Sequence, residues 1–139
     1  MGDAGEVRTS GNGLSWATHA ISGETGALLD VIYHDGQYVA VGEGGIVYTS
    51  PDGETWTSQS SDTTEDLSSV VWGDDEYVAL GSGVVTVSVD GEAWAAIAFP
   101  GEEETGDIIW TGDRYLASAG QTIYSSADGV TWTPVTIGE

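Results

Sequence analysis

Three aspartates recur at the same place in a repeated motif and are the first candidates for chemistry. Asp52, Asp90 and Asp128 each stand in a Ser-x-Asp-Gly sequence, and a Trp follows the Gly three residues later. A pair of carboxylates can hydrolyse a glycosidic bond when one acts as acid and the other as base or nucleophile. Ser, Asp and Gly in this order also form tight turns, because short polar side chains bond to nearby backbone groups and Gly accepts a positive φ. We interpret the motif as structural, since a turn explains each of its residues, and we predict no catalytic residue.

Basic residues are too few for a site that binds anions. The chain contains Arg8, Arg114 and no Lys against 23 Asp and Glu, which gives a formal net charge of −21. A field of this sign repels phosphate backbones and anionic lipid surfaces, so we expect no nucleic-acid partner and no membrane partner. Two interpretations of the charge stay open. One is a solvated surface suited to high salt, and the other is weak binding of divalent cations by carboxylate clusters.

Residues that could bind a metal are isolated in the sequence. His19 lies in a predicted connector and His34 in a predicted turn, and the chain has no Cys. The densest acidic cluster is Glu102-Glu103-Glu104 with Asp107, which we interpret as a solvated loop with weak cation binding as the alternative. No calcium-loop pattern is present. We therefore predict no cofactor and no metal site, and exposed loop positions for both histidines.

The Ser-x-Asp-Gly motif recurs at a fixed period. Its four tryptophans are spaced 40, 38 and 38 residues apart, and a period near 40 indicates a repeat architecture. The first copy has Asn in place of Asp, which still suits a turn. The residues assigned to the four structural motifs are Ser10, Asn12, Gly13 and Trp16; Ser50, Asp52, Gly53 and Trp56; Ser88, Asp90, Gly91 and Trp94; and Ser126, Asp128, Gly129 and Trp132.

The residues between the motifs predict short strands joined by tight turns. In the first full repeat, apolar runs cover 28–33, 38–41 and 46–50, and a fourth strand begins at 55–57 around the Trp. The chain before them supplies only a third and a fourth strand, at 7–10 and 15–18. Acidic, Gly-containing connectors cover 18–27, 59–67 and 98–106, and no segment has helical periodicity.

Four-stranded units at this period predict an all-β fold, a β-propeller of antiparallel blades. We expect one module over residues 1–139, with a half-blade at 6–18 and full blades at 26–59, 66–97 and 106–137. Aromatic residues close the first strand and open the second in each blade. We interpret them as cross-strand pairs, with a stacked platform for sugar rings as the alternative.

The Ser-x-Asp-Gly-x-Thr-Trp pattern resembles the Asp-box (BNR-like) repeat of sialidases and of photosystem assembly-factor propellers. The resemblance covers nearly the whole chain and implies the propeller fold. Sialidases of this kind need three arginines, and Arg8 and Arg114 cannot supply them, so the resemblance implies the non-enzymatic branch. We expect a non-catalytic structural or binding scaffold. The alternative is a carbohydrate-binding module or degenerate glycosidase.

The repeat count also predicts self-association. Common propellers have four to eight blades, and three and a half should not close a ring. We expect two copies to complete one, with a glycan or a protein as the external ligand; a four-bladed ring with one thin blade is the monomeric alternative. A natural halophilic module, a piece of a larger propeller and an engineered chain all stay open as origins. The same holds for location, since the composition suits a soluble protein outside the cell or in a high-salt cytoplasm.

Overall fold

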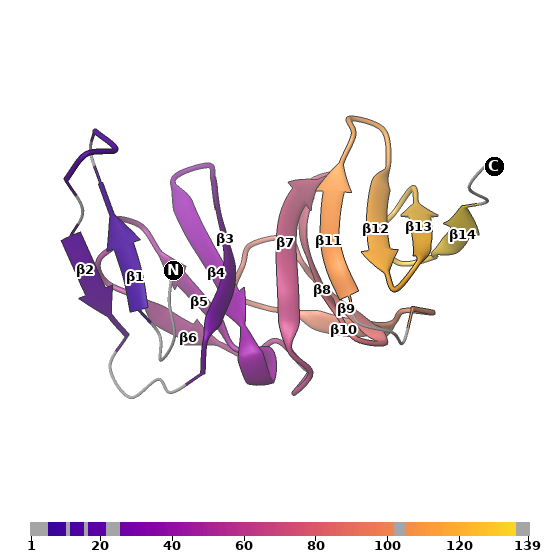
Figure 1. The fold of residues 1–139 in the computed structure, drawn as a ribbon, viewed down its shortest axis with the longest axis horizontal. Coiled ribbons are helices and arrows are strands. Elements are labelled where there is room, and N and C mark those ends of the chain that lie inside the picture. The colour runs from indigo at the N-terminus through magenta and orange to yellow at the C-terminus, as the bar shows by residue number, and fades with distance from the viewer. Residues whose placement is uncertain (1–5, 11, 16, 22–25, 102–104, 136–139) are drawn as a thin grey trace.

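The structure is a computed structural model that describes residues 6–10, 12–15, 17–21, 26–101 and 105–135. Its described residues form three four-stranded antiparallel sheets and one two-stranded sheet (Figure 1). The two-stranded sheet, or half-blade, contains β1 (Glu6–Thr9) and β2 (Ala17–Ala20). The predicted architecture of three full blades and an N-terminal half-blade is confirmed.

The strands of each blade are neighbours in chain order, so each blade is a simple meander. Tight turns after the first and third strands explain this order, because each turn returns the chain beside the strand just completed. Blade 1 contains β3 (Leu28–His34), β4 (Gln37–Gly42), β5 (Val47–Ser50) and β6 (Thr57–Gln59), with a 3₁₀ turn, η1 (Glu43–Gly45), between β4 and β5. Blade 2 contains β7 (Leu67–Gly73), β8 (Glu76–Gly81), β9 (Val84–Ser88) and β10 (Ala95–Ala98). Blade 3 contains β11 (Thr105–Trp110), β12 (Tyr115–Ala119), β13 (Thr122–Ser126) and β14 (Thr133–Val135).

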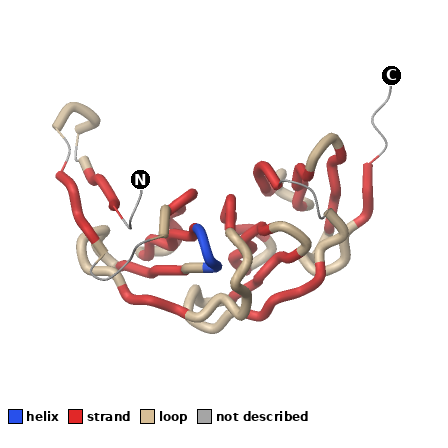
Figure 2. The backbone as a smooth tube through the Cα atoms, turned by 60° about the horizontal axis from the view of Figure 1, so that its bottom comes forward, coloured by secondary structure: helices blue, strands red, loops and turns tan. Residues whose placement is uncertain are grey.

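The four sheets stand side by side in an open arc (Figure 2). The half-blade lies at one end of the arc and blade 3 at the other, and the two ends do not meet. The first strands of successive blades are neighbours, with β3 beside β7 and β7 beside β11. This arrangement differs from the thin four-bladed ring, because the half-blade does not contact blade 3 in the arc.

The apolar core lies between blades and not within them. Each sheet has two faces, and side chains of consecutive blades meet across the gap that separates them. We call the contact of blades 1 and 2 joint 1, and the contact of blades 2 and 3 joint 2. The buried side chains of joint 1 are Val39, Val41, Val47, Leu67, Val70, Tyr77, Ala79 and Trp94. Those of joint 2 are Val78, Leu80, Val85, Phe99, Ile108, Tyr115, Ala117, Ala119 and Trp132.

The motif tryptophans immediately precede the fourth strands and do not lie within them, which corrects the predicted strand starts. Trp94 and Trp132 are buried, each 8% exposed, and pack against the preceding blade. Trp56 is only half-buried. It packs against the cluster of Ile21, Leu28, Ala40 and Tyr48, in which Ile21 follows strand β2. Trp16 lies outside the described residues.

Two further details of the sequence prediction are corrected. Strand β2 covers Ala17–Ala20, later than the predicted 15–18, so His19 lies in a strand and not in a connector. The whole turn of the motif therefore precedes this strand, as it does in the full blades. The acidic cluster Glu102-Glu103-Glu104 lies outside the described residues, and Asp107 belongs to strand β11.

No helix among the described residues is long and apolar enough to cross a membrane.

Candidate functional site

The Ser-x-Asp-Gly turns are closed by their own side chains, as blade 2 illustrates. Ser88 Oγ accepts the backbone N–H groups of Asp90 (3.3 Å) and Gly91 (2.8 Å). Asp90 Oδ1 accepts those of Glu92 (2.8 Å) and Ala93 (3.0 Å). The same side-chain bonds recur in the turns that begin at Ser10, Ser50 and Ser126. Each turn is thus a self-contained unit of hydrogen bonds.

The tryptophan that follows each turn in the full blades is tied back to it. The indole N–H groups of Trp56, Trp94 and Trp132 donate to the backbone oxygen of the motif Gly, at 3.1, 2.8 and 3.0 Å. This bond satisfies the polar edge of a ring whose body is packed against apolar neighbours. The turn and the ring therefore form one rigid corner at the end of each blade.

The motif carboxylates are stabilised in their ionised form. Backbone hydrogen bonds from the third and second residues after each Asp lower the pKa of Asp52, Asp90 and Asp128 below its ordinary value of 3.8. A carboxylate whose oxygen already accepts two backbone N–H groups is a poor proton donor at neutral pH. The arrangement therefore supports turn formation and provides no general acid.

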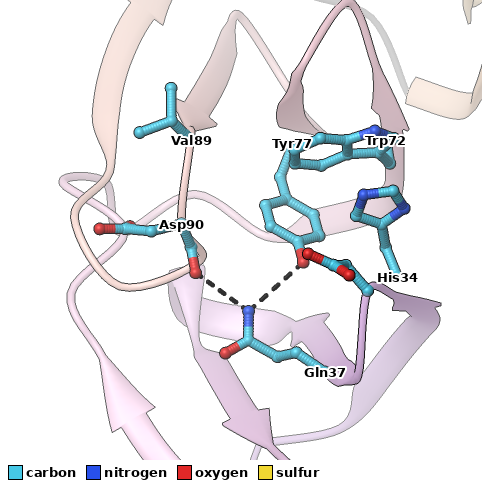
Figure 3. A pocket seen from close by; sticks show the side chains of 7 residues that line it. His34, Gln37, Trp72, Tyr77, Val89 and Asp90 are labelled. Atoms are coloured by element: carbon cyan, nitrogen blue, oxygen red, sulfur yellow. Dashed lines mark hydrogen bonds between the residues drawn. The ribbon is translucent and has the colours of Figure 1, made fainter.

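The candidate functional site is a pocket at joint 1 (Figure 3). The cavity has a volume of about 370 Å³ and opens where the β3–β4 turn of blade 1 meets the Ser-x-Asp-Gly turn of blade 2. The imidazole of His34 stacks on the indole of Trp72, with ring centroids 3.9 Å apart and an interplanar angle of 17°. His34 is half-buried, so the predicted exposed loop position is wrong. The indole of Trp72, from blade 2, covers one face of the imidazole. No sequence pattern indicated this contact. The lining residues are His34, Asp35, Gln37, Trp72, Tyr77, Val89 and Asp90.

Gln37 connects the two blades at the base of this pocket. Its side-chain N–H₂ group donates to the hydroxyl of Tyr77 (3.3 Å) and to the backbone oxygen of Asp90 (3.0 Å), as the dashed lines in Figure 3 show. Both partners belong to blade 2, whereas Gln37 opens strand β4 of blade 1. The amide therefore positions the turn that carries Asp90 against the aromatic wall.

Joint 2 has different residues at the equivalent positions. Gly73 takes the place of His34, and the indole of Trp110 lies against its backbone. A Cβ at Gly73 would lie 2.4 Å from that ring. Glu76 takes the place of Gln37, and its carboxylate accepts the Tyr115 hydroxyl at 3.3 Å. The single proton of this hydroxyl is shared with the backbone oxygen of Gly73. The site at joint 1 thus depends on an imidazole where the next blade has no side chain.

Joint 2 is expected to respond to pH through Glu76. Burial, followed by the nearby charges of Asp74 and Asp128, raises the pKa of Glu76 above its ordinary value of 4.5 against the opposing bond from Tyr115. A group whose pKa is raised on folding stabilises the fold below its unfolded pKa, and this contribution is lost as pH rises through the folded value. Glu76→Gln should therefore raise the thermal unfolding midpoint at pH 7 and leave it nearly unchanged at pH 4. Gln37 shows that an amide suits this position.

Glu92→Gln is the matched control for this measurement, because Glu92 is exposed and the substitution removes the same charge. A general effect of net charge would raise both midpoints equally at pH 7. Equal shifts would therefore contradict a specific role for Glu76.

A second polar network links the first strands of the three blades. Asp30 Oδ2 accepts the backbone N–H of Val70 (2.9 Å) and the hydroxyl of Ser69 (3.3 Å), so blade 1 is bonded to blade 2. Ser69 Oγ also lies 2.5 Å from Asp107 Oδ1, so its single proton is shared between the two aspartates, and it accepts the backbone N–H of Ile108 (3.3 Å), which bonds blade 2 to blade 3. Asp107 is thus part of an inter-blade network and not of an acidic loop, which corrects its assignment. The strand pairing irregularity at this position in each blade lets the side chain reach sideways.

The predicted cross-strand aromatic pairs are confirmed. Their ring centroids lie 4.7 Å apart in each blade. Tyr33 and Tyr38, Trp72 and Tyr77, and Trp110 and Tyr115 are also direct partners in the strand register. Because the rings contact one another across the strands, they do not form a continuous row of parallel faces of the kind that stacks sugars.

Within the described part of the chain, no three His, Asp or Glu side chains lie close enough to hold a metal ion. Sequence reasoning singled out the Ser-x-Asp-Gly turns but missed the joints. The one available signal was that two positions of the repeat change their residue type from blade to blade while the positions around them stay similar. The residue before the conserved Tyr is Gln37, Glu76 or Arg114, and the residue after the first-strand aromatic is His34, Gly73 or Thr111. Variable positions in an otherwise regular repeat mark the contacts that differ between blades.

Comparison with known proteins supports the fold alone. No family model matches the sequence, and no curated protein matches it. Two solved structures of YCF48 are similar. YCF48 bound to a D1 peptide is 19% identical with a TM-score of 0.65, and the match covers 77% of this chain and 38% of that one. YCF48 from Cyanidioschyzon merolae is 23% identical with a TM-score of 0.65, and the match covers 78% and 37%. The chain thus spans less than two-fifths of the length of either protein. The similarity to these propeller structures identifies the fold of the blades as that of a β-propeller.

Proposed function

We propose that this chain is a non-catalytic binding scaffold of the Asp-box propeller type, and that the pocket at joint 1 binds a cationic segment of a peptide. The observation that carries the proposal is the stack of His34 on Trp72 in a pocket that is also lined by two acidic residues, Asp35 and Asp90. Aromatic walls and fixed negative charge together are the surroundings that a Lys or Arg side chain prefers. YCF48, similar in fold, has been solved with a bound peptide, which supports a peptide as ligand.

Electrostatics favours a basic partner over a neutral or acidic one. The chain carries a formal charge of −21, and this field raises the local concentration of cations and speeds their association. At the pocket itself, Asp90 is held ionised by the backbone bonds that lower its pKa. A bound ammonium or guanidinium would therefore meet a carboxylate that does not need to lose a proton.

The proposal of a non-catalytic role rests on the state of the carboxylates and on the scarcity of arginine. Asp52, Asp90 and Asp128 are each engaged by their own turn, so none is available as an acid with a raised pKa. Arg114 pairs at 3.7 Å with its neighbour Asp113, at an exposed position. These features suit a surface that binds by charge and shape.

Binding of a short Lys/Arg-rich peptide should weaken when the pocket carboxylate is neutralised. Asp35→Asn is expected to lower the affinity by about threefold to fivefold, the effect of a partly exposed charge pair. Asn also tolerates the positive φ of 48° at this position. Isothermal titration calorimetry at low salt measures the change in affinity. His34→Ala tests the aromatic wall, and we expect it to lower the affinity by a similar or larger factor.

Asp113→Asn is the matched control for the peptide titration. Asp113 is an exposed carboxylate in the same turn of blade 3, so the substitution removes the same charge far from the pocket. If Asp35→Asn and Asp113→Asn weaken binding equally, the peptide is held by the general field and the pocket proposal fails. Tighter binding of a neutral oligosaccharide than of the peptide would favour the carbohydrate-binding alternative.

We further propose that two copies complete a ring. The arc is open, and its two ends carry different structures, a half-blade and a full blade. Two copies related by a two-fold axis could place each half-blade beside the other copy's blade 3, which gives six full blades and two two-stranded sheets. A species of twice the 14.4 kDa of one chain is the expected result in light scattering.

A further inference from the structure

Joints 1 and 2 are each closed by a turn of one blade that enters a recess of the blade before it. At joint 1 the entering residue is Gly91, whose φ is +83°. A Cβ added there would lie 2.6 Å from Gln37 Nε2 and 3.5 Å from Thr49 Cγ2. The positive φ favours Gly here, and a side chain would also displace the amide of Gln37. We call the entering turn the knob and the recess that receives it the socket.

Joint 2 repeats this geometry with other side chains. Gly129 is the knob, and a Cβ on it would lie 2.6 Å from Glu76 Oε2 and 3.2 Å from a methyl of Val78. Glu76 holds the place that Gln37 holds in blade 1. The knob and socket are therefore a repeated device of this chain, and the residue before the conserved Tyr lies at the edge of each socket.

Blade 3 carries the same socket with nothing in it. Arg114 stands in the place of Gln37 and Glu76, and Ser125 stands in the place of Thr49. Both line an open cavity of about 310 Å³. On the same side, Ile109 and Ile123 are 49% and 37% exposed, although the equivalent of Ile123 in blade 2, Val85, is fully buried by the next blade.

At the other end of the arc lies a knob that enters no socket formed by the residues the structure describes. The turn that contains Ser10 and residues 12–15 has the side-chain bonds of the other three, with Ser10 Oγ accepting the N–H of Gly13 at 2.7 Å. Gly13 has a φ of +78°, as Gly91 and Gly129 have similar values. A Cβ on Gly13 would meet no atom within 4 Å. The N-terminal turn is thus shaped like an inter-blade knob but is exposed.

We infer that the socket of blade 3 binds the N-terminal turn of a second copy of this chain. The inference rests on the self-association proposed above and names the surfaces that produce it. Arg114 would donate to the backbone oxygen of Asn12, as Gln37 donates to that of Asp90 in joint 1. The turn that enters has a neutral Asn in place of Asp, and it meets one of the two arginines in a chain with 23 carboxylates. Two such contacts around a two-fold axis use both ends of each copy.

The first test replaces Gly13 of the knob by a residue that the fold of a single copy can accept. Gly13→Asn adds a side chain at a position that is open within one copy, and Asn tolerates a positive φ. At the joint, the added side chain would displace the residue at the edge of the socket and its hydrogen bond to the knob, as a side chain at Gly91 would displace the amide of Gln37. Gly36→Asn is the matched control, since Gly36 has a φ of +84° and also meets no atom within 4 Å. Sedimentation equilibrium in molar NaCl, which screens repulsion between copies, gives the dimer dissociation constant.

The socket is tested by Ile109→Asp, with Leu29→Asp as its control because both side chains are about half exposed. Gly13→Asn and Ile109→Asp are expected to weaken dimerisation at least tenfold, and the two controls to leave it unchanged. A dimer that survives both knob and socket substitutions would overturn the inferred surfaces while leaving self-association intact. A wild-type chain that stays at 14.4 kDa at all concentrations would overturn both. The peptide pocket lies within one copy, so the result of the peptide titration does not depend on whether the chain forms a dimer.

Discussion

Replacing Trp94 by Ala is expected to lower the free energy of unfolding by about 3–5 kcal/mol, the range for removing a large buried aromatic side chain. The ring is 8% exposed and packs in joint 1 with Val39 and Val41, both fully buried. Its loss leaves a cavity between two blades and also leaves the backbone oxygen of Gly91 without its indole donor. Urea unfolding followed by far-ultraviolet circular dichroism measures the change.

Trp56→Ala provides the internal comparison. Trp56 makes the same indole bond to its turn, but its ring is less buried than that of Trp94. Since the hydrophobic contribution scales with the area removed from water, we expect a smaller loss than that seen for Trp94. Equal losses at the two positions would show that the turn bond, and not the packing between blades, determines the stability.

Raising NaCl from about 0.05 M to about 2 M is expected to raise the thermal unfolding midpoint by about 10 °C, or roughly 2–3 kcal/mol for a domain of this size. The 23 carboxylates have only Arg8 and Arg114 as opposite charges, so the folded chain repels itself. Salt shortens the range of this repulsion from about 10 Å at 0.1 M to about 3 Å at 1 M. A triple variant, Glu54→Gln with Glu92→Gln and Asp113→Asn, removes three exposed charges and should show a smaller salt effect.

Calcium separates the two interpretations of the acidic composition. If micromolar CaCl₂ at low salt reproduces the stabilisation seen in molar NaCl, specific cation binding is responsible and general screening is not. A midpoint that stays flat from low to molar salt would contradict the repulsion itself. The same screening governs self-association, because two copies that each carry −21 must approach closely at the joint.

Sequence by itself determined the features of this protein that depend on contiguous residues. Each Ser-x-Asp-Gly turn is closed by hydrogen bonds between residues two or three positions apart, so a short segment contains all the residues that form it. The repeat period and the alternation of apolar runs with turns then predicted three four-stranded blades and a half-blade, as observed. The aromatic pairs were predictable for the same reason, since a two-residue turn determines which residues face each other across a hairpin.

Only the tertiary structure decided what lies between the blades. The bonds from Gln37 reach Tyr77 and Asp90, 40 and 53 residues further along the chain, and no local pattern encodes such contacts. His34 appeared to be an exposed turn residue because the ring that covers it, Trp72, belongs to the next blade. Equivalent positions in one repeat frame therefore have different roles. The packing of sheet against sheet depends on the side chains of two blades at once, so the pocket, the Glu76 contact and the empty socket of blade 3 emerge only when the blades are placed side by side.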